Sequence, residues 1–274
     1  MATHLPRAET IEALATGFSE LRALLAGLDD DAWSTPTALP GWDVRANVAH
    51  VIGTEAFLAG DPTPTVEVDA ADLPHVRNDI GAMNEAWVLA LAEEPPQAIL
   101  DRLDDVTGRR LESLRAMTDE EWDAEGFTPA GRDAYGRFMR IRVFDCWMHE
   151  HDIRDAVGLP PRVEAVGAGL ALDEMETALG FVVGKRAGAP DGTAVTFALT
   201  GPAGRDIHVV VDGRAAVVPS LDRPADVTLT TDVHTFTRLA GGRTRWAETD
   251  DDRVAIDGDR VLGVRLLEHL AFTI

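Results

Sequence analysis

The sequence predicts an α+β protein in which a helical bundle precedes a small mixed domain. Apolar residues recur every three or four positions through most of the first 160 residues, which is the spacing of amphipathic helices. The segment Gly158-Leu159-Pro160-Pro161 then breaks the pattern. After it come short segments in which apolar and polar residues alternate, as is typical of strands. We therefore expect a helical domain over residues 1–161 and a small α+β domain over residues 162–274.

The first domain is expected to consist of long helices joined by loops that contain proline and glycine. Thr10 stands where the first helix would be capped and Asp43 where the second would be, because short polar side chains accept hydrogen bonds from the free amides of a first turn. Long helices connected in this way favour a four-helix bundle, in which one connection can be a long crossover. The expected helices cover residues 11–28, 44–57, 76–92, 97–117 and 132–157.

The second domain is expected to begin with a helix over residues 163–184. Val211-Asp212-Gly213-Arg214 is a turn signal between two of the strands that follow. Short helices at residues 232–240 and 259–271 flank the last strand. Strands mixed with helices in this order favour a small α+β domain. The expected strands cover residues 194–199, 207–211, 215–218, 226–230 and 253–256.

Composition argues against several classes of function. The net charge of −22 disfavours binding to nucleic acid or to an anionic membrane, because both need clustered lysine and arginine. We see no apolar run long enough to span a bilayer and no secretory signal, so we expect no membrane segment and no export. The single cysteine, Cys146, fits a reducing compartment. The sequence thus predicts a cytoplasmic protein.

Two segments could hold a metal ion between two helices. Asp145 and His149 lie four residues apart and so share one face of their helix, with Asp152 three residues further along the same side. His50 lies among small and apolar residues of another helix. Each signal alone has a simpler explanation, a surface pair for the first and a core histidine for the second. Together, the two histidines and Asp145 could supply the three ligands of a catalytic zinc with an open fourth position.

Neighbouring groups are weaker candidates. His151 lies two residues past His149 and would face elsewhere on the helix, so we expect it on the solvated surface. Cys146 would point about 100° away from Asp145, and we expect it to pack in the core rather than to act as a nucleophile. The sequence also lacks a phosphate-binding glycine loop and a nucleophile elbow.

Two motifs resemble the mycothiol-dependent maleylpyruvate isomerase family of the DinB-like metalloprotein superfamily. Residues 39–45 read Leu-Pro-Gly-Trp-Asp-Val-Arg and lead to His50, and residues 145–154 contain the pattern Asp-x-x-x-His-x-x-Asp-Ile. The family's patterns are Pro-Gly-Trp-x-Val-Arg before a histidine, and Glu-x-x-x-His-x-x-Asp-Ile. Residues 224–229 and 255–259 resemble its C-terminal domain, which is similar to sterol carrier proteins. The resemblance covers nearly the whole chain.

This resemblance implies a four-helix bundle that holds zinc through His50, Asp145 and His149. Asp145 takes a position where the family has glutamate, which is one methylene longer. The metal would therefore lie nearer to that helix, or a water molecule would bridge. Asp152 matches an aspartate of the family and is expected to orient a ligand or an arginine.

The same resemblance implies a zinc-dependent isomerase or S-transferase that uses mycothiol. The thiol would take the open position on the metal, lose its proton and attack a small electrophile such as maleylpyruvate. A dicarboxylate substrate would need cations. Arg243 and Arg245 are the candidates for that catalytic contact and Arg223 for contact with the cofactor, although a structural role at the surface is the more common one for each.

Two other functions stay open. A non-catalytic metal-binding or regulatory protein of the same fold is favoured if Asp145 cannot complete the site. A carrier of apolar ligands would use the second domain, which has few large apolar residues free to line a tunnel. The expected partners are a small electrophile and a low-molecular-weight thiol, and the protein is expected to be a monomer or a homodimer.

Overall fold

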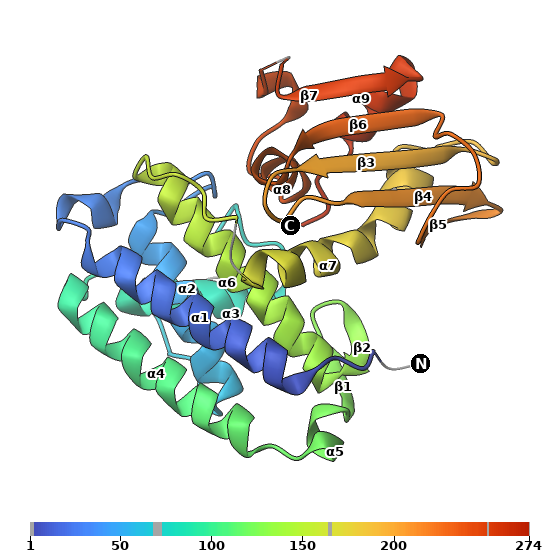
Figure 1. The fold of residues 1–274 in the computed structure, drawn as a ribbon. Coiled ribbons are helices and arrows are strands. Elements are labelled where there is room, and N and C mark those ends of the chain that lie inside the picture. The colour runs from blue at the N-terminus through green and yellow to red at the C-terminus, as the bar shows by residue number, and fades with distance from the viewer. Residues whose placement is uncertain (1–2, 68–72, 164–165, 251, 274) are drawn as a thin grey trace. The chain divides into compact units, whose positions relative to one another are not determined.

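The computed structural model describes residues 3–67, 73–163, 166–250 and 252–273. The chain divides into two compact units, Met1–Pro161 and Arg162–Ile274. The first is helical and the second carries a five-stranded sheet, so the expected α+β class is confirmed (Figure 1). None of the described helices is long and apolar enough to cross a membrane.

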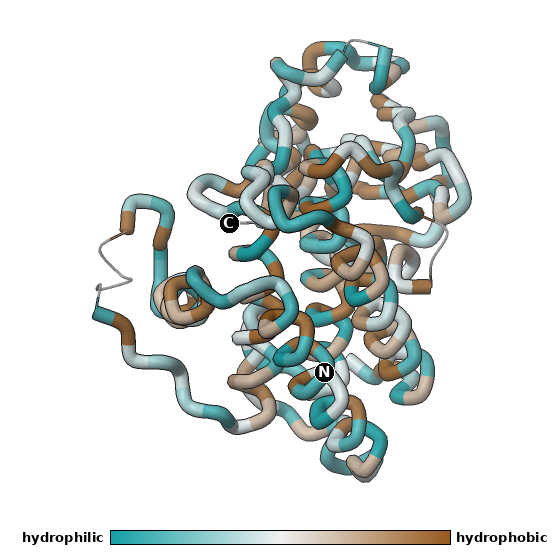
Figure 2. The backbone as a smooth tube through the Cα atoms, turned by 90° about the vertical axis from the view of Figure 1, so that its left-hand side faces the viewer, coloured by the Kyte–Doolittle hydropathy of each residue, from teal (hydrophilic) through white to brown (hydrophobic). Residues whose placement is uncertain are grey.

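The first unit is built on a four-helix core. α1, α2, α4 and α6 pack against one another, and α3 packs against α2. Brown and teal residues alternate along the helices in Figure 2, as is typical of helices that have an apolar and a polar face. Buried side chains of this core include Leu14, Leu21, Val48, Leu103 and Met139. The long helices are α1 (Arg7–Ala26), α2 (Val44–Leu58), α3 (Asp79–Leu91), α4 (Pro96–Ala116) and α6 (Tyr135–Ala156).

The predicted caps are right for α2 and wrong for α1. The Asp43 side chain accepts a hydrogen bond from the amide of Ala46 at 2.8 Å and so caps α2. α1 begins at Arg7, and Thr10 lies within its first turn, where its hydroxyl donates to the carbonyl of Pro6. Pro6 takes the N-cap position in an extended conformation, and no side chain caps the helix there.

The start of α6 also differs from the prediction. Gly131–Ala134 (β2) pairs with Glu125–Thr128 (β1) in an antiparallel hairpin, so α6 begins at Tyr135 instead of residue 132. A single-turn helix, α5 (Asp119–Trp122), precedes the hairpin. A short 3-10 helix (Asp31–Ser34) between α1 and α2 is a further element that the sequence pattern does not predict.

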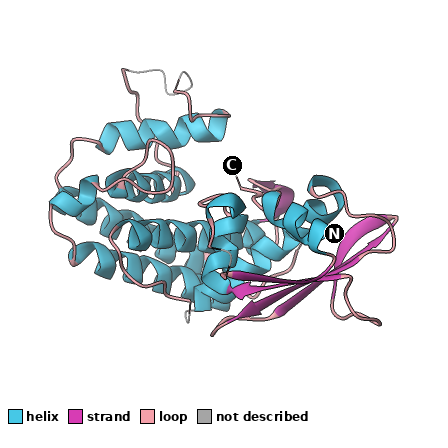
Figure 3. Cartoon of the chain, turned by 90° about the horizontal axis from the view of Figure 1, so that it is seen from above, coloured by secondary structure: helices cyan, strands magenta, loops and turns pink. Residues whose placement is uncertain are grey.

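The second unit is a mixed sheet with helices packed on it. Its strand order is β5-β4-β3-β6-β7 (Figure 1). All neighbours are antiparallel except the parallel pair β3 and β6. Figure 3 shows the strands in magenta and the helices in cyan. Every predicted strand is found, with ends that differ by at most two residues. The strands are β3 (Ala194–Thr200), β4 (Asp206–Asp212), β5 (Arg214–Val218), β6 (Val227–Asp232) and β7 (Val254–Gly258).

Three helices cover this sheet. α7 (Val166–Phe181) packs against β4 and β5. α8 (Val233–Ala240) packs against β3 and β6, and α9 (Arg260–Glu268) packs against β6 and β7. The predicted first helix also included residues 164–165, which lie outside the described residues. A Cβ atom at Gly180 would lie 2.9 Å from the carbonyl oxygen of Ala215, so the close approach of α7 to β5 requires glycine there.

Candidate metal centre

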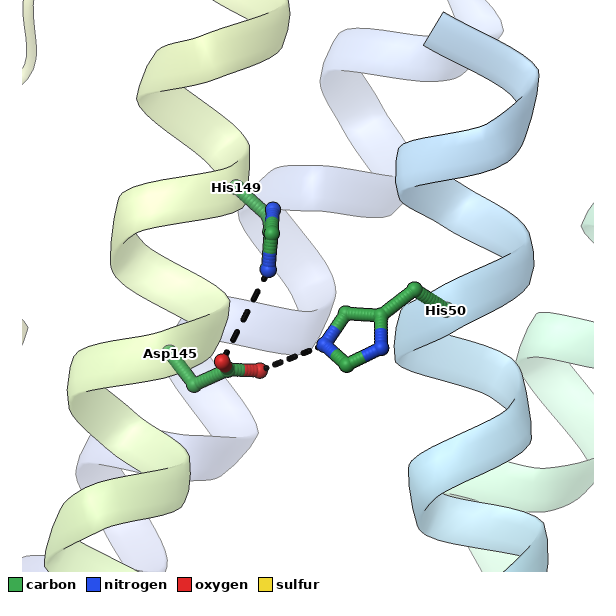
Figure 4. A group of neighbouring side chains, drawn as sticks. All are labelled: His50, Asp145 and His149. Carbon is green, nitrogen blue, oxygen red and sulfur yellow. Dashed lines mark hydrogen bonds and ion pairs between the residues drawn. The ribbon is translucent and has the colours of Figure 1, made fainter. Parts of the chain in front are cut away.

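His50, Asp145 and His149 meet between two helices of the first unit. His50 extends from α2, and the other two extend from α6 toward it (Figure 4). His50 Nε2 lies 3.1 Å from Asp145 Oδ2, and His149 Nε2 lies 3.6 Å from Asp145 Oδ1. Both imidazole rings are buried, and the side chain of Asp145 is 28% exposed. The carboxylate therefore forms the accessible edge of the cluster.

The donor set fits zinc. One ligand atom from each of the three residues can be chosen so that all lie within 4.8 Å of one another. Two ligands at about 2.0–2.2 Å from a tetrahedral zinc lie about 3.3–3.6 Å apart, close to the spacing of the Asp145 oxygens and the two ring nitrogens. Two imidazoles and a carboxylate are also a known zinc ligand set that keeps one position open.

Asn47 fixes which nitrogen of His149 faces the cluster. The Asn47 amide nitrogen donates to the carbonyl of Asp43 at 2.8 Å, so its amide oxygen points to His149 Nδ1, also at 2.8 Å. An amide oxygen only accepts, so His149 Nδ1 carries the proton and Nε2 presents its lone pair. The carboxylate of Asp152, which is fully buried, lies 3.3 Å from the same Nδ1. This is how proteins commonly orient a metal-binding histidine.

The pKa values of the two histidines are shifted in opposite directions. Burial lowers the pKa of His50, although Asp145 acts in the opposite direction, and the ring is held in the neutral form that binds metal. Burial also disfavours the charged form of His149, but Asp145 and Asp152 outweigh it and raise its pKa. Because its pKa is raised, protons compete with a metal for Nε2 of His149 as the pH falls.

Asp145 is ionised in this setting. Burial opposes its charge, but Arg142 and the two histidines outweigh burial and hold the pKa of Asp145 well below its ordinary range. Arg142 Nη1 lies 2.5 Å from Asp145 Oδ2. The carboxylate is thus both a potential ligand and the partner of a buried guanidinium.

Trp42 forms an aromatic wall beside the two histidines. Its ring centroid lies 5.2 Å from that of His50 and 5.9 Å from that of His149. Trp42 Nε1 donates to Glu85 Oε2 at 2.9 Å, and His75 Nε2 lies 3.1 Å from the same oxygen. The indole N–H is therefore bonded to Glu85 of α3, while the rest of the ring lies beside the two histidines.

His151 is a correction to the sequence-based expectation. It is only 1% exposed, and its Nδ1 donates to the carbonyl of Trp147 at 2.8 Å. Its ring also stacks on Trp147 with centroids 4.0 Å apart. Cys146 is buried as expected, and burial raises the pKa of its thiol. The expected solvated position of His151 is wrong.

The three candidate arginines lie in the second unit, each with local partners. Arg223 pairs with Asp226, and Arg245 pairs with the exposed Glu248. Arg243 Nη1 donates to the carbonyl of Gly241 at 2.7 Å. These contacts are structural, and a role toward a substrate or cofactor stays a prediction.

Asn47, Trp42 and Arg142 belong to the surroundings of the cluster and are not predicted from the sequence. Spacing could have pointed to two of them, because Asn47 lies three residues before His50 and Arg142 three residues before Asp145. Trp42 is part of the quoted Pro-Gly-Trp motif, but its contact with both histidines depends on the loop that precedes α2.

The arrangement matches a known family in both units. Residues 14–154 match the model described as the mycothiol maleylpyruvate isomerase N-terminal domain, and residues 169–265 match the MDMPI C-terminal domain. The chain belongs to the mycothiol-dependent maleylpyruvate isomerase family. The centre formed by His50, Asp145 and His149 lies in the N-terminal domain of that family.

Individual relatives are more distant. Uncharacterized proteins from two strains of Mycobacterium tuberculosis are 26% identical over 144 residues, which is 51% of this chain and 53% of each relative. The match thus spans about half the length of these curated relatives. Crystal structures of the mycothiol-dependent maleylpyruvate isomerase and of a histidine-to-alanine mutant of it align with TM-scores of 0.57 and 0.58 at 18% and 19% identity. Each alignment covers 92% of this chain and 93% of the other, and shows that the fold is shared.

Proposed function

We propose that the protein is a zinc-dependent enzyme that uses mycothiol to act on a small electrophile. The reaction is isomerisation of a maleylpyruvate-like compound or transfer of the thiol sulfur to the electrophile. The observation that carries this proposal is the convergence of His50, Asp145 and His149 from α2 and α6. Membership of the mycothiol-dependent maleylpyruvate isomerase family supports the thiol and the class of substrate.

The residues of this chain would divide the work as follows. His50 and His149 present ring nitrogens, and Asp145 presents a carboxylate oxygen that offsets part of the charge of the metal. Asn47 and Asp152 keep His149 in the required tautomer. Trp42 packs beside both imidazole rings and would help to keep water from them. The exposed edge at Asp145 is the side from which a thiol would enter.

When bound, zinc would lower the pKa of a coordinated thiol enough to favour the thiolate near neutral pH. A thiolate adds to the double bond of a cis-enedioate. Rotation about the resulting single bond and loss of the thiol then give the trans isomer. With an electrophile that cannot eliminate the thiol, the conjugate is the product.

The test combines metal content with turnover. Purified protein is expected to contain stoichiometric zinc and to isomerise maleylpyruvate only when mycothiol is added, with the rate lost after treatment with a chelator and restored by zinc. An unchanged rate after the metal is gone would refute the mechanism. A protein that never holds stoichiometric metal would remove the enzyme assignment.

Two further results would narrow the assignment. If zinc is present but maleylpyruvate is inert, the substrate assignment fails and other electrophiles are tried with the same thiol. If none of them reacts, the protein is a non-catalytic metal-binding member of the fold. Contacts from Arg223, Arg243 or Arg245 to the substrate or the thiol are tested by alanine substitution. A raised KM is expected for each contact that exists.

A further inference from the structure

A chain of buried charges runs away from the metal centre through the bundle. Glu55 Oε2 accepts from Arg110 Nε at 3.0 Å, and Glu55 Oε1 accepts from Arg142 Nε at 2.8 Å. Arg142 Nη1 reaches Asp145 Oδ2. The side chains of Arg110, Glu55 and Arg142 are 2%, 1% and 3% exposed. These groups come from three helices, α2, α4 and α6.

The charges balance only if Asp145 is counted. Two guanidinium groups face one carboxylate, Glu55, and each of its oxygens is taken by a different arginine. Asp145 supplies the second negative charge through Arg142. A buried charge without a partner is costly, so the bundle holds Asp145 against Arg142 strongly.

Arg142 also fixes the direction in which Asp145 points. The planar guanidinium engages Glu55 with Nε and Asp145 with Nη1, so its orientation is set from the far side by Glu55. Oδ2 of Asp145 is held by Nη1 of Arg142 and also lies 3.1 Å from His50 Nε2. Oδ1 is left facing His149 Nε2.

We propose that Arg142 is a positioning residue for the metal centre, which holds one oxygen of Asp145 and presents the other as a single-oxygen ligand. This inference rests on the metal site proposed above. Glu55 anchors Arg142, and Arg110 completes the pairing of Glu55. Arg110 also bonds to the hydroxyl of Tyr135, and within the described part of the chain it makes no hydrogen bond or ion pair with Asp145.

Arg110 therefore provides a matched control. Arg110 and Arg142 are similarly buried and share Glu55, but only Arg142 contacts the carboxylate of the cluster. Arg142→Lys and Arg110→Lys each keep the positive charge. Both lose the planar set of N–H donors, because one ammonium cannot reproduce the geometry of a guanidinium. Zinc affinity is measured for both by competition with a chromophoric chelator, on the full chain after removal of metal.

Arg142→Lys is expected to weaken zinc binding about 10- to 100-fold, which is the usual effect of losing a group that orients a ligand. Arg110→Lys is expected to leave the zinc affinity nearly unchanged, because Arg110 does not contact Asp145. The thermal midpoint of the metal-free protein should fall by similar amounts in both. The visible absorption of the cobalt-substituted protein should change only in Arg142→Lys, because these bands report the ligand geometry.

Three outcomes would overturn the inference. Equal loss of zinc affinity in the two variants means that the charge chain only stabilises the bundle. Unchanged affinity in Arg142→Lys means that Asp145 needs no positioning. If the unaltered protein binds no zinc, the proposed function fails and this inference fails with it. Should Arg142→Lys not fold, Glu55→Gln releases the anchor of Arg142 and must also weaken zinc binding, whereas no change would refute the proposal.

Discussion

The two units bury different kinds of polar side chain. In the second unit they are mostly threonines, whose hydroxyls bond to a backbone carbonyl, as in Thr231 and Thr237, or to one polar side chain, as in Thr196 and Thr235. In the first unit most are ionisable, and burying such groups costs stability unless each is paired. The comparison indicates that the first unit gives up stability to keep a polar centre, as functional sites commonly do. The buried threonines are Thr193, Thr196, Thr231, Thr235 and Thr237, and the buried groups of α2 and α6 include His50, Glu55, Arg142, His149, Glu150, His151 and Asp152.

The largest difference between the units should be in metal retention. His50→Ala and His149→Ala each remove a ligand and are expected to abolish zinc retention through gel filtration, as measured by elemental analysis. His208→Ala in the second unit, where the ring contacts Thr196, should leave the zinc content unchanged. His151→Ala should also retain zinc. Loss of zinc in His208→Ala would place the metal elsewhere in the chain.

The next largest effect concerns stability. Glu55→Ala leaves two buried guanidinium groups with one carboxylate fewer, and should cost about 3–5 kcal/mol of unfolding free energy in the first unit. Tryptophan fluorescence during urea unfolding reports mainly on that unit, since Trp246 alone among six tryptophans lies in the second. Glu248→Ala, an exposed ion-pair partner in the second unit, should leave the transition unchanged. If Glu55→Ala leaves the unfolding free energy unchanged, unpaired buried charge costs little stability in this unit.

A smaller effect is expected for a buried threonine of the second unit. Thr231 Oγ1 donates to the carbonyl of Arg253 at 2.8 Å, and Thr231→Val keeps the shape of the side chain while removing that bond. The loss should be about 1 kcal/mol, the usual net value of one hydrogen bond. Urea unfolding followed by far-ultraviolet circular dichroism measures it. A cost as large as that of Glu55→Ala would abolish the contrast between the units.

The smallest effect is a pH dependence in the second unit. Hydrogen bonds from Arg223 and from the amide of Ala194 lower the pKa of Asp226 from 3.8 to about 2. Because the folded pKa lies below the unfolded one, this stabilisation is present above pH 3.8 and is lost as the pH falls toward about 2. Asp226→Asn should flatten unfolding stability across that range. An unaltered slope would mean that the pair contributes nothing, as is common for exposed ion pairs.

Local patterns were enough to predict most elements. Each strand of the second unit is bounded by turn residues, such as Gly213 between β4 and β5, and alternation within it sets the buried face. The β1–β2 hairpin was missed because its four-residue strands are too short to show a period. Thr10 was misread as a cap because the actual start, after Pro6, carries no capping side chain.

The sequence predicts the three candidate ligands of the site but not the residues that surround them. His50, Asp145 and His149 stand out because metal ligands are few in kind and their spacing is local. The tautomer of His149 depends on Asn47, and the direction of Asp145 depends on a guanidinium anchored by Glu55. These contacts join α2 to α6 and need the tertiary packing. His151 was misplaced for the same reason, since its burial is set by neighbouring elements and not by its spacing from His149.

Helix α2 carries Asn47, His50 and Glu55 on successive turns, and each of them serves a different partner on α6. Inserting one residue between Asn47 and Glu55 would rotate everything after it by about 100°. Such an insertion would separate at least one of these three residues from its partner on α6. A substitution at one position could not restore the lost contact. The spacing within α2 is therefore fixed to the residue, so length changes in relatives that keep the metal centre are expected in loops, such as the one between α2 and α3.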